Sequence, residues 1–180
     1  MKDIKITDKL GGIRITAADA LVVAQKFASD PEGLAATGSN APRDQAGLKR
    51  VLKKALEHGT QLWRVPIGND LFGAIVGDDP FTQEETRLFI WLDPQHRGDD
   101  LGIQLVAETI HRLAQEGRER VVAKPPRSNY AALRILNALE FIYIGEDSDD
   151  SSEANKKVLF ERGTRGGPSV PTPIQRDLAG

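Results

Sequence analysis

Cysteine is absent from the 180-residue sequence, so the chain forms no disulfide, offers no thiolate nucleophile and has no cysteine-ligated metal site. Long apolar runs are missing too, because no segment approaches the roughly 20 residues that a membrane-spanning helix needs. Residues Met1–Asp8 lack the apolar core of a secretory signal. The formal net charge of −2 argues against a general affinity for nucleic acid or anionic membranes. A cytoplasmic protein is therefore expected.

The length and the hydrophobic content of 39% indicate one domain with its own core. We expect a single domain over residues 1–162 and a flexible C-terminal tail over residues 163–180, where Gly and Pro recur. The three histidines have no spacing that is typical of a metal site, so no metal is predicted.

The stretch from Thr86 to Leu105 has the clearest pattern. An apolar strand over Arg87–Leu92 runs into a short turn with Gly98, and a helix pattern begins at once. Apolar residues recur at helical spacing and mark one buried face of that helix: Leu101, Leu105, Val106, Ile110 and Leu113. The first turn of a helix has unpaired N–H groups and the positive end of the helix dipole, so the turn favours an anionic guest such as a phosphate.

The remaining pattern alternates strands and helices. Helices are predicted after the capping residues Thr16, Asp44 and Asn129, and a flexible loop over Gly33–Asn40. A polar turn is predicted from Asp78 to Glu85. Six strands are expected besides the one at Arg87–Leu92, namely 13–15, 61–66, 71–76, 121–123, 141–144 and 157–161. This order indicates a mixed sheet with helices on both faces.

The turn resembles the acyl-CoA-binding motif of the GNAT superfamily of N-acetyltransferases, which reads Arg-Gly-x-Gly-x-Gly. Four positions match, namely Arg97, Gly98, Leu101 and Gly102, while Asp100 stands in place of the middle glycine. A second family motif, an Asn that begins a helix followed by Gly-Phe, is similar to the segment from Asn129 to Phe141. Asn129, Ala132, Leu139 and Phe141 fit that motif, and Glu140 replaces its glycine.

The resemblance implies an α/β (α+β) fold with a mixed, mostly antiparallel central sheet of about seven strands and helices on both faces. It also implies acetyl-CoA as the co-substrate. The backbone of Ile90, Trp91 and Leu92 would bind its pantetheine arm, with Asn129 and Ala132 beside it. The pyrophosphate would lie on the turn formed by Arg97, Gly98, Asp99, Asp100, Leu101, Gly102 and Ile103.

Two features of the motif residues count against a standard site. The carboxylates of Asp99 and Asp100 would repel a phosphate unless they turn into water, although acidic residues are also favoured at helix N-termini. Leu136 stands where many family members have a Tyr that protonates the departing thiolate. The candidate acid is therefore Tyr130, another residue or water, and the candidate base is Glu85. Both side chains are equally compatible with exposed, non-catalytic positions.

The resemblance implies transfer of an acyl group, namely acetyl, from coenzyme A to a primary amine by direct attack on the thioester. The acceptor is a small molecule or a protein. Two alternatives stay open: a non-catalytic module of the same fold that binds a ligand or partner, and a specialised enzyme with another acyl donor or an unusual target such as nucleic acid. Homodimers are common in the family, but no feature of this sequence predicts one.

Overall fold

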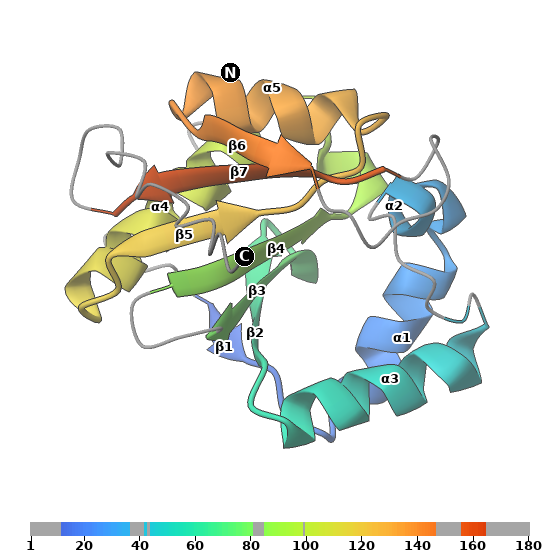
Figure 1. Cartoon of the computed structure of the whole chain (residues 1–180). Coiled ribbons are helices and arrows are strands. Elements are labelled where there is room, and N and C mark those ends of the chain that lie inside the picture. The colour runs from blue at the N-terminus through green and yellow to red at the C-terminus, as the bar shows by residue number, and fades with distance from the viewer. Residues whose placement is uncertain are drawn as a thin grey trace, which may run out of the picture.

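A seven-stranded sheet with the order β1-β2-β3-β4-β5-β7-β6 forms the centre of the computed structural model (Figure 1). The structure describes residues 12–36, 42, 44–80, 85–98, 100–146 and 156–164. The strands are β1 (Ile13–Arg14), β2 (Gln61–Ile67), β3 (Asp70–Pro80), β4 (Glu85–Leu92), β5 (Arg120–Ala123), β6 (Ile142–Glu146) and β7 (Val158–Gly163). All neighbours pair antiparallel except β4 and β5, which are parallel.

Two of the described helices begin at a side chain that caps them. Asp44 accepts a hydrogen bond from the Gly47 N–H at 2.8 Å, and Asn129 accepts one from the Ala132 N–H at 3.0 Å. Asp19 reaches back to the Thr16 N–H at 2.8 Å, as predicted for that turn. The helices are α1 (Ala20–Ala28), α2 (Pro31–Ala36), α3 (Gln45–Glu57), α4 (Leu101–Gln115) and α5 (Tyr130–Ala138), with a short 3₁₀ turn η1 (Pro94–His96).

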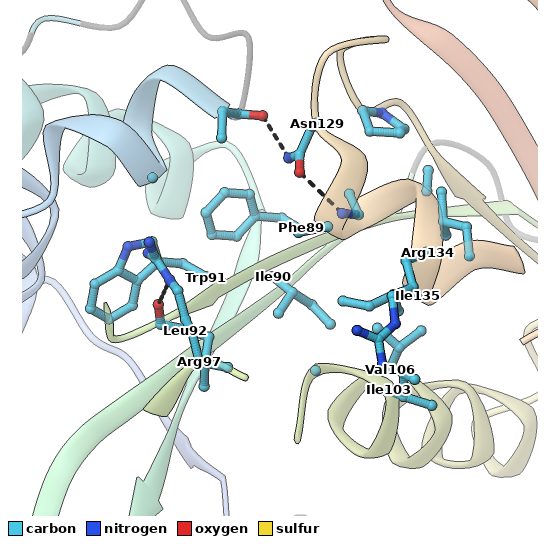
Figure 2. A pocket seen from close by; sticks show the side chains of 18 of the residues that line it. Phe89, Ile90, Trp91, Leu92, Arg97, Ile103, Val106, Asn129, Arg134 and Ile135 are labelled. Carbon is cyan, nitrogen blue, oxygen red and sulfur yellow. Dashed lines mark hydrogen bonds between the residues drawn. The ribbon is translucent and has the colours of Figure 1, made fainter. Parts of the chain in front are cut away.

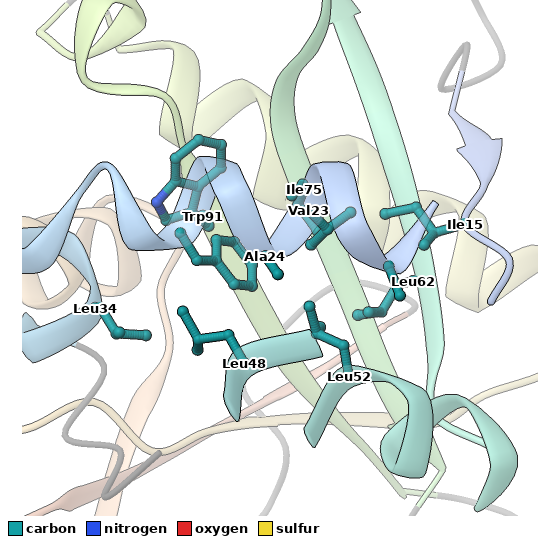
Figure 3. Close-up of a cluster of buried hydrophobic side chains, with 11 residues drawn as sticks. Ile15, Val23, Ala24, Leu34, Leu48, Leu52, Leu62, Ile75 and Trp91 are labelled. Carbon is teal, nitrogen blue, oxygen red and sulfur yellow. The ribbon is translucent and has the colours of Figure 1, made fainter. Parts of the chain in front are cut away.

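The two faces of the sheet carry separate cores because strand side chains alternate. On β3, Ile75 packs toward α1 and α3, while its neighbours Ala74 and Val76 pack toward α4. Figure 3 shows the first core, which includes Trp91 of β4, Ala24 of α1 and Leu48 of α3. The second face is covered by α4 and α5. Helices on both faces of a mixed, mostly antiparallel sheet are the predicted architecture, and this prediction is confirmed.

Some local predictions were wrong. The first part of the predicted loop at Gly33–Asn40 is helical, because α2 runs from Pro31 to Ala36, with the proline in the first turn, where its missing N–H has no cost. Residues 37–41 lie outside the described part. β3 continues through Pro80, where a turn was predicted, because its register with β4 runs on to Thr86. Gly163, where the predicted tail begins, is the last residue of β7. Residues 165–180 lie outside the described part, so a tail there stays a prediction.

The predicted apolar face of α4 is buried throughout, and it includes Leu105 at 0% exposure. We expect Leu105→Ala to lower the free energy of unfolding by about 3 kcal/mol, because it removes buried methyl groups and leaves a cavity. Val51 on α3 is 44% exposed, so Val51→Ala should change that free energy by less than about 0.5 kcal/mol. Urea denaturation of both variants checks this, and equal losses would contradict the assignment of α4 to the core.

Candidate functional site

β4 and β5 separate after a short parallel pairing. They pair only over Glu85–Arg87 and Arg120–Val122, whereas β4 continues to Leu92 and pairs with β3 along its other edge. Pro125 and Pro126 follow β5 and have no N–H to continue a ladder with β4. The Pro125 carbonyl instead accepts from the Val158 N–H at 3.0 Å, and Pro126 bridges to Lys157. The chain is thereby drawn toward β7, and a cleft opens beside the end of β4.

This cleft is a cavity of about 590 Å³ with a mainly apolar wall (Figure 2). Figure 2 shows Trp91 and Arg97 on one side and Ile103, Val106 and Ile135 on the other. The segments that line it come from five parts of the chain: α2, the end of β4, the turn into α4, the stretch after β5, and α5. A concave, largely apolar cavity with a few polar groups is typical of a small-molecule or cofactor site.

The exit of β4 is held in place by charged groups. Asp93 accepts from the Gln95 N–H at 3.2 Å and from Lys26 Nζ at 2.8 Å, and Lys26 also pairs with Asp70 at 3.0 Å. Burial alone would lower the pKa of Lys26, but its hydrogen bonds to Asp93 and Asp70 outweigh burial and raise it. The chain therefore enters the turn before α4 from a fixed position.

The turn before α4 contributes Arg97, Gly98 and Asp100 to the cavity lining. Gly98 has φ 109° and Asp100 has φ 53°, so both are left-handed, a region that glycine adopts freely and Asp tolerates. The Asp100 side chain does not cap α4, and it pairs instead with Arg134 of α5 at 2.8 Å. The Ile103 N–H already bonds the Asp100 carbonyl at 3.0 Å. The N–H groups of Leu101 and Gly102 have no acceptor within the helix, so they are available to a guest.

Gly102 sits where α4 comes close to α5. A Cβ at this position would lie 2.7 Å from Cδ1 of Ile135, closer than real Cβ contacts. The missing side chain therefore lets the start of α4 approach α5 closely, and Gly102, Ile103 and Ile135 together line the cavity.

A buried carboxylate joins the turn to the opposite wall. Asp30 is 4% exposed and accepts from the Trp91 indole N–H at 2.8 Å, from the Gly33 N–H at 3.0 Å and from the guanidinium of Arg97. Arg97 Nε also donates to the Leu92 carbonyl at 3.0 Å. Burial alone would raise the pKa of Asp30, but the Arg97 guanidinium and the other donors outweigh it and hold that pKa below its usual range.

Asn129 connects α5 to α2. Its side-chain oxygen caps α5, and its Nδ2 donates to the Ala36 carbonyl at 2.8 Å, across the cavity mouth. The predicted cap is therefore present, and the same side chain also lines the cavity.

The structure brings nearly all the residues of the predicted cofactor site together. The cavity lining includes Ile90, Trp91, Leu92, Arg97, Gly98, Asp100, Leu101, Gly102, Ile103, Asn129 and Ala132. Asp99 lies outside the described part. That these residues bind a cofactor stays a prediction.

The two predicted catalytic residues lie elsewhere. Glu85 begins β4 and pairs with Arg120 at 3.4 Å, away from the cavity lining. Its place follows from register, because Glu85 lies opposite Arg120 in the paired part of the two strands. Tyr130 is 77% exposed and does not line the cavity either. Leu136, which stands where the family has its Tyr, is 4% exposed and faces the cavity.

Sequence reasoning missed three polar residues at or beside the cavity, namely Asp30, Arg134 and Glu32. Asp30 and Arg97 are 67 residues apart, so no local pattern links them. Arg134 could have been noticed on α5, because it lies only two positions before Leu136 in the second motif. Glu32 lies just before the segment that was predicted to be a loop.

Among the described residues, no group of three or more His, Cys, Asp or Glu side chains could hold a metal ion. The described helices include none long and apolar enough to cross a membrane.

No protein-family model and no curated protein sequence matches the chain. Its structure, however, is similar to solved acetyltransferases. A ribosomal-protein-S5-alanine acetyltransferase from Vibrio fischeri has a TM-score of 0.68 and 20% identity, over 86% of this chain and 92% of that one. A ribosomal L7/L12 alpha-N-protein acetyltransferase in complex with coenzyme A has a TM-score of 0.73 and 13% identity, over 89% and 97%.

Spermidine N-acetyltransferase from Vibrio cholerae, in complex with CoA and spermine, has a TM-score of 0.72 and 9% identity, over 88% of this chain and 97% of that one. Further neighbours of this kind are described as GNAT acetyltransferases. The chain therefore has the GNAT acetyltransferase fold, as the motifs predicted. At this level of identity the likeness establishes the fold, and the reaction has to be argued from the site.

The Asp30–Arg97 pair generates a pH-dependent prediction. Because the folded-state pKa of Asp30 is lowered, its ionised form stabilises the fold above the unfolded pKa of about 3.9, and this contribution is lost as pH falls through the folded pKa. Asp30→Asn should therefore lower the free energy of unfolding at neutral pH by about 2 kcal/mol. The difference from wild type should shrink toward about pH 3.

Urea denaturation at both pH values measures this difference. Adding Arg97→Gln to Asp30→Asn should cost less than the sum of the two single changes, because both remove the same pair. A loss that is equal at both pH values, or strict additivity, would show that the pair has no such role.

Proposed function

We propose that the protein is an acyl-CoA-dependent N-acyltransferase that transfers an acyl group, namely acetyl, to a primary amine by direct attack. The observation that carries this proposal is the cleft between β4 and β5, which ends at the uncapped first turn of α4. A strand edge without a partner can bond an extended amide-bearing arm, and the helix start can hold a diphosphate. Coenzyme A has both parts in one molecule.

The residues present fit such a molecule. The turn residues Gly98 to Gly102 would hold the pyrophosphate on their N–H groups, and the apolar wall of Ile90, Val106 and Leu136 would lie along the pantetheine arm. The predicted repulsion by Asp100 is offset, because its carboxylate is paired with Arg134. Several of the similar solved structures hold CoA or acetyl-CoA, which supports the same ligand here.

The amine would attack the thioester carbonyl directly, since the chain has no cysteine to carry the acyl group. The new N–C bond forms as the C–S bond breaks, and the amine proton is lost to a base. The apolar Leu136 offers no proton to the departing thiolate. Tyr130, which was predicted for this role, is largely exposed, so we assign that proton to water. The cavity holds the reactants close together, which supplies much of the acceleration.

Acetyl-CoA should bind to the protein, and an amine panel should then release free coenzyme A thiol. Calorimetry measures the binding and a thiol-reactive dye measures the release. Binding without release for any amine would favour a non-catalytic binding module. Absence of binding would exclude acetyl-CoA as the donor and would be followed by the same test with longer acyl-CoA esters.

The position of the pyrophosphate is tested at Gly102 with a pair of variants. Gly102→Gln and Gly102→Glu have similar size and meet the same side chain of Ile135, but only Glu adds a negative charge beside the turn. We expect the Glu variant to bind acetyl-CoA roughly five-fold more weakly than the Gln variant at low salt, because like charges near 4 Å cost about 1 kcal/mol in water. Equal affinities would place the pyrophosphate elsewhere. The melting temperatures of the two variants should agree.

A further inference from the structure

The charged side chains on the cavity wall differ in whether they are already paired. They are Glu32, Arg97, Asp100, Lys124 and Arg134. Arg97 binds Asp30, and Asp100 binds Arg134. Lys124 also has an interaction within the described part of the chain. Glu32, in contrast, has no hydrogen bond or ion pair to another described residue, so within that part of the chain its carboxylate is not engaged in holding the fold together.

The backbone around Glu32 is fixed at both ends of α2. The next residue, Gly33, donates its N–H to Asp30 at 3.0 Å, and a Cβ on Gly33 would lie 1.9 Å from the Asp30 carboxylate. At the other end, the Ala36 carbonyl accepts from Asn129 at 2.8 Å. α2 is therefore attached to both the cofactor side and α5, and it holds the exposed side chain of Glu32 at the cavity wall.

A carboxylate at this position suits a cationic acceptor. An alkylamine has a pKa near that of lysine, about 10.4, so it arrives as an ammonium ion and must lose a proton before it attacks. A carboxylate attracts the ammonium and can take the proton, directly or through one water. The predicted base Glu85 is already engaged with Arg120 and lies outside the cavity lining.

We propose that Glu32 is the acceptor-site carboxylate of this protein, which binds the ammonium group of an aliphatic amine at the cavity wall and takes its proton as the nitrogen is acylated. This inference rests on the proposed function. The proton passes from nitrogen to the Glu32 carboxylate, the nitrogen lone pair forms the bond to the carbonyl carbon, and the C–S pair leaves with the thiolate, which water protonates.

The test uses the full chain with acetyl-CoA and four amines as probes: n-butylamine, putrescine, spermidine and a peptide with a free N-terminus. For the best of these, Glu32→Gln should lower kcat/KM by roughly 100-fold or more, the range typical of a lost general base. Its affinity for acetyl-CoA should stay within about two-fold of wild type, because the glutamine keeps the size of the side chain and the turn residues that would hold the pyrophosphate are unchanged. Glu32→Asp should restore part of kcat/KM.

The control is Glu57→Gln, an equally conservative change on the exposed end of α3, which should leave kcat/KM unchanged. Glu85→Gln separates the two candidate carboxylates. A larger loss for Glu85→Gln than for Glu32→Gln, or full kcat/KM in Glu32→Gln, would overturn the inference while leaving the acyltransferase function intact. If wild type binds acetyl-CoA but acylates none of the four probes, the inference is overturned together with the catalytic function.

Discussion

The separation of β4 from β5 is the constraint on which the rest of the site depends. Two strands that start in register must be forced apart, because a continued ladder would satisfy their N–H and C=O groups. Here the cause is the sequence after β5. Pro125 and Pro126 have no N–H to donate to β4, and the segment pairs with β7 instead. The edge of β4 that is left unpaired leads along the cavity to the N-terminus of α4.

The cavity also depends on contacts that join distant segments. Asp30 connects the α1–α2 corner to the turn before α4 through Arg97, and Asn129 connects α5 to the end of α2. These polar contacts are worth more than surface pairs, because Asp30 is buried and an unpaired carboxylate there would lose its solvation. These contacts therefore hold the wall that would face an acceptor and the turn that would face a phosphate in a fixed position relative to each other.

Local parts of this structure could be predicted from the sequence, and long-range parts could not. The apolar face of α4, the cap at Asn129 and the strand before the turn all have short-range patterns, and each appears as expected. Glu85 illustrates the limit: its distance from the cavity follows from its pairing with Arg120, which depends on strand register rather than on any motif. Glu32 was missed because a short helix that begins with Pro and contains Gly reads as a loop.

Two of the departures from the family motifs, Asp100 and Leu136, have opposite physical consequences. Asp100 keeps the backbone shape that the motif's glycine provides, because a short polar side chain tolerates the left-handed region, and Arg134 compensates its charge. Leu136 has no such compensation, since the buried position offers no proton donor beside the wall where the thiolate would form. The cavity thus keeps the backbone shape proposed to hold a cofactor but offers no acid at Leu136. An enzyme of this kind would depend on the acceptor side, and on the carboxylate placed there, for its proton transfers.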